Sequence, residues 1–273
     1  MAEVFGFDAY SPKEIAERVE TVGVAKARLP LLSQLTLGVL AGGFIGLGSL
    51  SFTLVTSDAS LGFAASRLLG GLAFSLGLIL VVVAGAELFT GNTLLVMAWA
   101  DRRITGLKLL RNWLIIYLAN FAGALGLVCL VYFSGHWQMH DQGIGANAVK
   151  IAAAKIAIPF WEAFFKAILC NILVCLAVWL SLAGRTVTDR ILAVIFPVSA
   201  FVAAGFEHSV ANMYFIPLGI LLQNHFPVLG ATAVTWTGLL ENLVPVTLGN
   251  IAGGGGMVAA VYHLVYHRRC PEH

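Results

Sequence analysis

The sequence predicts an all-α integral membrane protein with six transmembrane helices, arranged as two inverted repeats of three, in which the second and fifth helices are broken. Composition is the first indication: the 273 residues are 59% hydrophobic and only 11% charged, with a mean hydropathy of +0.88. Soluble domains carry about 25% charged residues. The second indication is a set of long stretches almost free of charge, and the third is a polar motif that occurs twice inside them.

The N-terminal segment, residues 1–28, is expected to hold a short amphipathic helix on the cytoplasmic surface. Ser11 is placed to cap this helix, Pro12 to take its first position and Glu14 to complete a capping box. Four apolar residues then share one face: Ile15, Ala16, Val19 and Val22. Such a helix serves either as a passive anchor or as a gate.

Six stretches are long enough to cross a membrane, which takes roughly 20 apolar residues. They form a six-helix domain over residues 29–267, followed by a cytoplasmic tail at 268–273. A long polar stretch, from His136 to Lys155, separates the third span from the fourth. The predicted spans are 29–57, 68–86, 112–133, 167–184 with a start near residue 160, 191–222, and 242–267 with a start near residue 234.

The distribution of Lys and Arg predicts the orientation of these spans. With six spans, both termini and the second and fourth connections lie on one side, and that side carries twelve of the sixteen basic residues. Basic residues concentrate in cytoplasmic loops, so both termini are expected in the cytoplasm of a multi-pass protein of the inner (plasma) membrane. The other side holds only Arg67, Lys150, Lys155 and Lys166.

The repeated motif reads G-x-E-x-x-x-x-N. Its first copy contains Glu87 and Asn92, and its second copy, 120 residues later, contains Glu207 and Asn212. A carboxylate, an amide and a helix-loosening glycine are costly in hydrocarbon. Two matched breaks in two membrane helices, meeting at a polar pathway, explain their repetition.

A second match supports an internal duplication. Asn112 and Asn120 are followed 130 residues later by Asn242 and Asn250, each pair in a similar context. The first three spans therefore resemble the last three. Because each half has an odd number of spans, the halves must cross the membrane in opposite directions. Repeats of about 29–135 and 160–267 are thus expected around a pseudo-two-fold axis.

The two motif carboxylates, Glu87 and Glu207, need a partner at this depth. A bare carboxylate costs at least about 2.5–3.5 kcal/mol at mid-membrane, so each is expected to be protonated or bonded to backbone N–H groups freed by the break. They either maintain the shape of the broken loops or contact the permeating solute directly.

His208 is the strongest functional candidate, because it has no counterpart in the first repeat, where Leu88 stands. Histidine titrates near pH 6.5 and can donate a proton under ordinary conditions. Thr90, in the other break, is placed to form a hydrogen bond with His208 and fix its tautomer. The nearby apolar residues either pack or form a ring that excludes water: Phe74, Leu78, Leu88, Phe89 and Phe201.

Other chemistry has little support in the sequence. Cysteine spacing indicates neither a metal site nor a disulfide framework, and His136, His140 and His225 are either scattered surface residues or a metal-binding trio. No cofactor is expected. The formal charge of +2 gives no indication of a nucleic-acid partner, so the lipid bilayer and a small solute are the expected partners.

Four strings are similar to the formate/nitrite transporter family: AGAELFTGNTL, LCNILVCLAVW, AAGFEHSVANMYFIPLGI and NLVPVTLGNIAGG. The resemblance covers nearly the whole chain. Several blocks resemble the formate channels more than the nitrite channels, whereas FTGNT has the nitrite-channel spelling. The family implies an aquaporin-like fold, a homopentamer with one pore per protomer, and transport of formate or a similar small anion rather than enzymatic activity.

The resemblance also implies roles for individual residues. The central histidine and its threonine partner correspond to His208 and Thr90, and the acidic neighbour to Glu207. The vestibule lysine corresponds to Lys155, and the asparagine of the fourth helix to Asn171. The constriction residues correspond to Phe74, Leu78, Leu88, Phe89, Val174 and Phe201.

These residues suggest a mechanism. Lys155 draws the anion into a vestibule, and the anion acquires a proton at His208 or nearby and passes the apolar ring as the neutral acid, because desolvating a charge costs much more. Passive or proton-coupled transport both fit. Nitrite, hydrosulfide, acetate or lactate are alternative substrates. A neutral-solute pore, and an intramembrane enzyme with His208 as base and Ser209 as nucleophile, are the alternatives from other classes.

Overall fold

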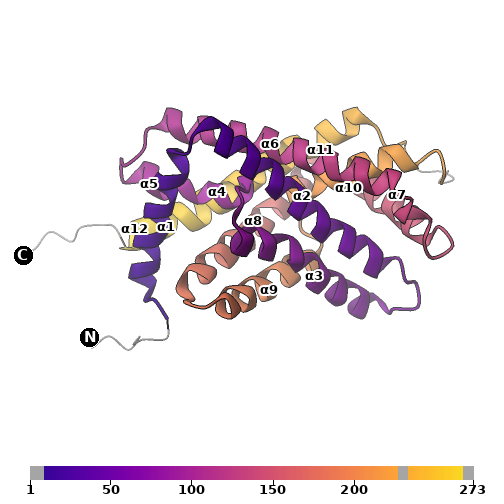
Figure 1. Ribbon diagram of the computed structural model, residues 1–273, viewed down its shortest axis with the longest axis horizontal. Helices are drawn as coiled ribbons and strands as arrows, with labels where there is room; N and C mark the ends of the chain where they lie inside the picture. Colours follow the sequence, from indigo (N-terminus) through magenta and orange to yellow (C-terminus); the bar gives the residue numbers. More distant parts are fainter. Residues whose placement is uncertain (1–8, 227–232, 267–273) are drawn as a thin grey trace, which may run out of the picture.

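The computed structural model describes residues 9–226 and 233–266. The predicted tail, and the final residue of the last predicted span, lie outside the described residues. Across those two ranges the regular structure is entirely helical, so the predicted all-α class is confirmed. Figure 1 shows the long helices running side by side between two ends, with α1 and α12 together at one end and α7 at the other.

Within residues 9–226 and 233–266, six helical segments are long and apolar enough to cross a membrane, as predicted. The second consists of α3 followed by a π-helical segment, η1, and the sixth contains a π-helical segment, η4, between two α-helical ones. The six are α2 (Leu31–Thr56), α3 (Phe63–Ile79) with η1 (Leu80–Gly85), α6 (Gly106–Phe133), α8 (Phe160–Ala183), α9 (Val187–Ala204), and α11 (Trp236–Ile251) with η4 (Ala252–Ala260) and α12 (Val261–Tyr266).

Shorter helices complete the bundle. Three of them continue the second span beyond its break, and α10 continues the fifth. The shorter elements are α1 (Pro12–Ala27), α4 (Phe89–Asn92), η2 (Thr93–Leu95), α5 (Val96–Ala100), η3 (His136–Gln138), α7 (Gly143–Ile156) and α10 (Ser209–Leu222).

Three spans begin earlier than predicted. The fifth begins at residue 187 rather than 191 and includes Asp189 and Arg190. The second begins at residue 63 rather than 68 and includes Arg67, and the third begins at residue 106 rather than 112 and includes Lys108 and Arg111. A helix can carry long charged side chains in its terminal turns, because they reach polar surroundings. Thr105 caps the third span, accepting a hydrogen bond from the Lys108 amide at 3.3 Å. Counting uncharged residues therefore places the start of all three helices too late.

The polar stretch between the third and fourth spans contains a helix that the sequence analysis did not predict. This helix, α7, buries Ile144, Ala148, Val149 and Ala152 and packs against α10. Its alanine-rich sequence favours a helix, but Lys150 and Lys155 give the segment a polar appearance. The end of α7 carries Lys155 into the bundle.

Small residues let four helices approach closely in matched pairs. On α2 and α6, Gly42 faces the carbonyl of Asn120. On α8 and α11, Gly249 faces the carbonyl of Phe164. A Cβ atom at either glycine would occupy the position of that carbonyl, so the pairs depend on glycine.

Both broken helices change direction at a glycine with positive φ. Gly85 has φ +86° and Gly205 has φ +75°, a backbone region that other residues adopt with strain. Residues 86–88 and 206–208 are non-helical, and α4 and α10 begin immediately after them. Each repeated motif therefore spans a break and the start of the next helix.

The predicted start of α1 is confirmed. The Ser11 amide donates to Oε2 of Glu14 at 2.7 Å, and the Glu14 amide donates to Oγ of Ser11 at 3.4 Å, which is the reciprocal pattern of a capping box. Pro12 occupies the first helical position.

The apolar face of α1 packs on the protein itself, and its location at the cytoplasmic surface stays a prediction. Ile15, Ala16 and Val19 are buried in a cluster with residues of η2, α5, α8 and η4. Val22 lies seven positions after Ile15 and so on the same side of the helix, but it is 39% exposed. In the last two turns the buried residues are Gly23, Val24 and Ala27.

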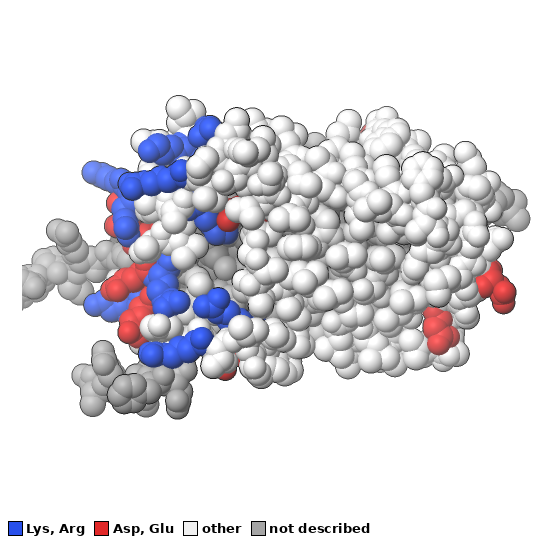
Figure 2. Space-filling view, in the orientation of Figure 1, with Lys and Arg blue, Asp and Glu red and all other residues white. Residues whose placement is uncertain are grey.

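On the face shown in Figure 2, charge at the surface lies at the two ends of the molecule. Figure 2 shows Lys and Arg gathered at the end where α1 and α12 lie, a broad uncharged belt, and a few acidic side chains at the far end of the face shown. An uncharged belt between polar ends is the surface expected of a protein that spans a bilayer.

Candidate functional site

The two broken helices meet at a hydrogen bond between His208 and Thr90. His208 lies directly before α10, and Thr90 lies in the single turn of α4. Nε2 of His208 is 2.9 Å from Oγ1 of Thr90, and both residues are buried. The contact joins residues 118 positions apart, as the sequence analysis predicted.

The second ring nitrogen of His208 is also occupied. The Ala211 amide donates to Nδ1 at 3.1 Å, so the ring caps α10. A nitrogen that accepts an N–H bond carries no proton, which assigns the neutral tautomer with its proton on Nε2. Nε2 then donates to the Thr90 oxygen. In residues 9–226 and 233–266 the Thr90 hydroxyl has no further hydrogen-bond partner, so its own proton is free to donate.

Glu207 lies beside His208 in a buried network of side chains. Its carboxylate accepts hydrogen bonds from Nζ of Lys155 at 3.0 Å and from the side-chain Nδ2 of Asn212 at 2.7 Å. Asn212 also donates to Asn242 at 2.7 Å, and Asn242 donates to the carbonyl of Lys155 at 2.9 Å. The loop, α7 and α11 are thereby connected through one carboxylate.

The first repeat contains the same network. Glu87 accepts from Lys26 at 3.1 Å and from Asn92 at 2.8 Å. Asn92 donates to Asn112 at 3.0 Å, and Asn112 donates to the carbonyl of Lys26 at 3.4 Å. The residues of the two networks correspond one to one. One bond differs, because Lys26 also donates to Asn92 Oδ1 at 2.9 Å, whereas Asn212 Oδ1 has no partner among the described residues.

These networks correct one expectation. The partners of both carboxylates are a lysine and an asparagine side chain, rather than freed backbone N–H groups. An ammonium partner compensates a buried carboxylate better than an amide does, because it also neutralises the charge. Each carboxylate thereby connects its broken loop to a lysine and to the helix that follows the break.

Lys26 was missed by the sequence analysis. A signal was present, because Lys26 and Lys155 are 129 residues apart, close to the spacing of 130 between Asn112 and Asn242. The predicted repeats began at residues 29 and 160 and left both lysines outside. The matched contacts extend the equivalence to the ends of α1 and α7.

Asn120 and Asn250 secure the non-helical backbone in the same way. The Asn120 side chain accepts from the Phe89 amide at 2.9 Å and donates to the carbonyls of Gly38 at 2.8 Å and Glu87 at 2.9 Å. Asn250 repeats the pattern with Ser209, Ala167 and Glu207 at 3.0, 2.9 and 3.0 Å. The sequence analysis had used both asparagines only as evidence of duplication.

Asn171 supports Thr90 from the fourth span. Its Nδ2 lies 3.2 Å from the Thr90 carbonyl, 3.1 Å from Oγ1 of Thr93 and 2.6 Å from the Asn250 carbonyl. Its Oδ1 is buried and, within the described residues, has no hydrogen-bond partner. Gly254 of η4 faces this same cluster, where a Cβ atom would meet Thr93, Asn171 and Cys175.

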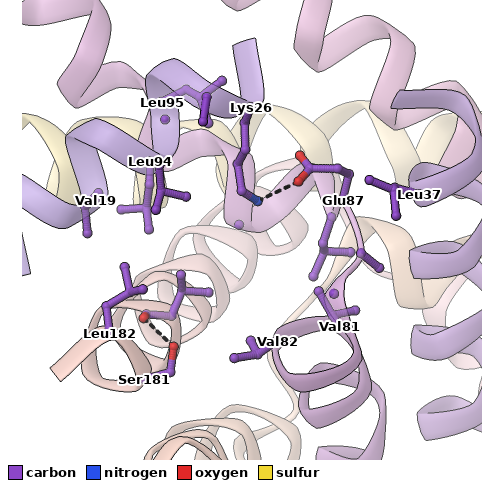
Figure 3. Close-up of a pocket in the computed structure, with 18 of the residues that line it drawn as sticks. Val19, Lys26, Leu37, Val81, Val82, Glu87, Leu94, Leu95, Ser181 and Leu182 are labelled. Atoms are coloured by element: carbon purple, nitrogen blue, oxygen red, sulfur yellow. Dashed lines mark hydrogen bonds and ion pairs between the residues drawn. The ribbon is translucent and has the colours of Figure 1, made fainter. Parts of the chain in front are cut away.

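Two cavities enter the bundle from its two ends. The first, of about 550 Å³, lies at the α1 end and is lined by Lys26, Glu87, Leu78 and Leu88; Figure 3 shows Lys26 reaching from α1 across this cavity to Glu87. The second, of about 420 Å³, lies at the α7 end, where Phe74, Phe201, Glu207 and His208 line it. Lys155 and the three other basic residues of that side line the second cavity as well.

The predicted constriction residues are all buried, and they belong to one apolar cluster. Phe74 and Phe201 meet edge to face at 5.8 Å, and Phe201 lies nearly parallel to the His208 ring at 6.1 Å. Phe89 is different, because it packs against Tyr117 at 4.9 Å and lines neither of the two cavities. Val174 also lines neither of them.

The structure does not support the two alternative chemistries, an enzyme that uses His208 with Ser209 and a metal site of histidines. Both ring nitrogens of His208 are engaged by other groups, and Ser209 Oγ is buried with no partner in the described part of the chain. His225 lies against Trp137 at 4.8 Å. In that same part of the chain, no group of three or more His, Cys, Asp or Glu side chains is placed to hold a metal ion.

Six spanning helices, two of them interrupted where polar side chains converge, and cavities entering from both ends define an integral membrane protein of the channel and transporter class. The family model for formate/nitrite transporters matches residues 13–264. The chain therefore belongs to the formate/nitrite transporter family, and the resemblance stated from the sequence is confirmed.

Individual relatives agree with this assignment. The chain is 39% identical to the formate channel FocA of Escherichia coli K12 over 98% of both chains, and 41% identical to that of Haemophilus influenzae over 90% of this chain and 91% of the relative. Among solved structures it is similar to a pentameric formate channel with formate bound, with a TM-score of 0.80 and 38% identity over 87% of this chain and 98% of that one.

Proposed function

We propose that this protein forms a transmembrane pore for formate, which crosses as the neutral acid after meeting His208 and Thr90. The observation that carries the proposal is the 2.9 Å contact between these two side chains, because it places hydrogen-bond donors where the two breaks meet and beside a cavity. The relatives named formate channels support formate as the substrate.

A chain of donors points toward the anion. The Ala211 amide donates to His208 Nδ1, His208 Nε2 donates to Thr90, and the Thr90 hydroxyl donates to formate. Successive hydrogen bonds polarise one another, and the N-terminal end of α10 adds its positive potential. Formate is thus bound by its charge before it is neutralised.

Proton transfer follows at the same place. Charging the imidazole places a proton on Nδ1, where it faces the Ala211 N–H and replaces a hydrogen bond with repulsion between two donors. The charged ring is therefore short-lived. We propose that His208 takes up a proton only transiently and passes one to formate through Nε2 and the Thr90 hydroxyl. This transfer leaves a neutral ring with its proton on Nδ1. Loss of that proton to water and return of a proton from water to Nε2 restore the tautomer that accepts from the Ala211 amide, so that one proton is consumed for each formate neutralised.

The apolar side chains between the cavities make this step necessary. Phe74 and Phe201 border the second cavity, and Leu78 and Leu88 border the first. An anion loses most of its hydration in such a passage, whereas formic acid does not carry that full cost. Phe89 and Val174 belong to this region as packing support for the constriction.

Each cavity contributes a cation beside its buried carboxylate. Lys155 in the second cavity and Lys26 in the first raise the local concentration of anions near the mouth. We propose Lys155 as the vestibule lysine, with Lys26 as its counterpart.

Assembly and orientation belong to the same proposal. The solved relative is pentameric, and we propose a homopentamer with one pore per protomer. The basic end in Figure 2 supports placing α1, both chain termini and the first cavity on the cytoplasmic side of the inner membrane.

The test is uptake by purified protein in proteoliposomes. We expect rapid uptake of radiolabelled formate and, in a separate swelling assay, no response to glycerol. Swelling with glycerol as fast as with formate would indicate a neutral-solute pore. A panel of nitrite, hydrosulfide, acetate and lactate ranks the alternative anions, and preference for any of these over formate would replace formate as the substrate.

A further inference from the structure

Arg67 is a charged residue inside a membrane span for which the mechanism has so far given no role. It lies in the second turn of α3 and is half-buried. Arginine in a transmembrane segment is costly, and it persists where it pairs with carbonyl groups or lines an aqueous cavity. Arg67 does both, because it lines the second cavity and donates to two backbone carbonyls.

Those carbonyls belong to the last turn of α9. Nη2 of Arg67 donates to Val202 O at 2.7 Å, and Nε donates to Ala203 O at 3.0 Å. The turn is also closed by Gly205, whose amide donates to Val202 O at 3.1 Å, and by Phe206, whose amide donates to Phe201 O at 3.0 Å. Arg67 thus supplies the bond to Ala203 O that the backbone cap does not make.

Phe201 lies in this same turn. Its ring contacts Phe74, which is two helical turns after Arg67 on α3. The helix α3 therefore contacts the end of α9 at two points. The Arg67 guanidinium binds the carbonyls, and the Phe74 ring packs against Phe201. Movement of the turn would change the distance between the two rings that border the cavity.

The first break is closed differently. There the π-helical η1 ends with the Ala86 amide donating to Val81 O at 3.0 Å. The residue 120 positions after Arg67 is Val187, which carries no donor on its side chain. Support by a guanidinium is therefore a property of the second repeat, the one that carries His208.

We infer that Arg67 is a positioning residue that sets the size limit of the pore, by fixing Phe201 against Phe74. The inference rests on the proposed function and deepens it. Substrates are small monocarboxylic acids, and Arg67 excludes the larger members of this class.

A role in attracting anions is the competing explanation, because Arg67 shares its cavity with Lys150, Lys155 and Lys166. The two roles predict different results. Loss of an attracting charge slows the uptake of all monovalent anions alike and weakens its dependence on ionic strength. Loss of a positioning contact changes the ratio between large and small acids.

The experiment compares uptake of lactate and formate in proteoliposomes. We expect Arg67→Met to raise the lactate-to-formate ratio by about tenfold, which is the scale on which a pocket discriminates by one or two carbon groups. Lys150→Met removes a charge from the same cavity without touching the carbonyls, and its ratio should stay at the wild-type value. Arg67→Lys should give an intermediate ratio, because an ammonium is a point charge and lacks the fork of a guanidinium.

A second variant approaches the turn from its other side. In Gly205→Ala the new Cβ would lie 3.0 Å from Nη2 of Arg67 at a positive φ, so this variant should also raise the ratio. A lactate-to-formate ratio that is unchanged or lower in Arg67→Met and Gly205→Ala would overturn the inference. If Arg67→Met does not assemble, an unchanged ratio in Arg67→Lys would overturn it. Wild-type protein that takes up no formate would instead reject the proposed function.

Discussion

Lys26 and Lys155 occupy equivalent positions in the two halves of the molecule. Lys26, in the last turn of α1, lies 3.1 Å from Glu87, and Lys155, in the last turn of α7, lies 3.0 Å from Glu207. Each lysine also accepts a hydrogen bond at its backbone carbonyl from an asparagine of its own repeat. Two helices outside the six spans thereby become part of the site.

Removing one of these lysines should destabilise the fold. Breaking a buried pair from one side leaves an uncompensated charge and costs about 3–5 kcal/mol. We expect Lys155→Met to approach the lower value, and Lys26→Met to cost less, because its side chain is 26% exposed against 15% for Lys155. The free energy of unfolding in detergent measures both.

The control for this prediction is the double variant Lys155→Met/Glu207→Gln, which removes the charge that Lys155→Met leaves behind and should recover much of the loss. Equal stability of Lys155→Met and Lys150→Met would contradict the account.

A methyl group at Gly254 should disturb the support of Thr90. Its Cβ would meet Thr93, Asn171 and Cys175, whereas Gly256, two residues later, faces open space. We expect Gly254→Ala to lose about 1–3 kcal/mol of stability through overpacking and to slow formate uptake about tenfold or more. Gly256→Ala should match wild type in both, and similar behaviour of the two variants would exclude a role for this packing.

The capping box makes α1 sensitive to acid. The Glu14 carboxylate accepts hydrogen bonds from the Ser11 amide and hydroxyl, and these bonds lower the pKa of Glu14 below its ordinary value of 4.5. Because the folded pKa is the lower one, this stabilisation is complete above pH 4.5 and is lost as the pH falls through the folded pKa. The protection of the α1 amides from hydrogen exchange, taken relative to unfolded peptide at the same pH, should therefore fall in acid.

The matched variant is Glu14→Gln, which cannot titrate. Its exchange should be faster than that of wild type at pH 6 and should approach it at low pH. A wild-type protein with the same pH profile as Glu14→Gln would show that the capping box does not stabilise α1.

Much of the fold is readable from the sequence because hydrocarbon imposes a simple rule. Spans must be long and apolar, so the six helices are found by counting. The two breaks are visible because Glu87 and Glu207 stand where only a polar network explains them. Helix starts are harder to predict. Arg67, Lys108 and Arg111 lie inside helices whose predicted starts, based on uncharged residues, are several residues too late.

The site is only partly readable for a different reason. The pairing of His208 with Thr90 follows from two breaks that meet on one axis, whereas the partner of Glu87 is on α1, which the sequence presents as a separate amphipathic segment. The grip of Arg67 on α9 joins residues 135 and 136 positions apart. A contact between a side chain and a distant backbone carbonyl cannot be predicted from any local sequence pattern.

Formate uptake by His208→Phe across acidic and neutral pH tests the central claim most directly, with Ser209→Ala as the neighbouring control, because Ser209 Oγ is buried without a hydrogen-bond partner among the described residues. Proteoliposomes loaded with a pH-sensitive dye report proton movement with the anion. We predict that His208→Phe loses the wild-type pH dependence and the accompanying proton uptake, while Ser209→Ala keeps both. Uptake by His208→Phe as fast as wild type at every pH, with protons still following formate, would contradict the account.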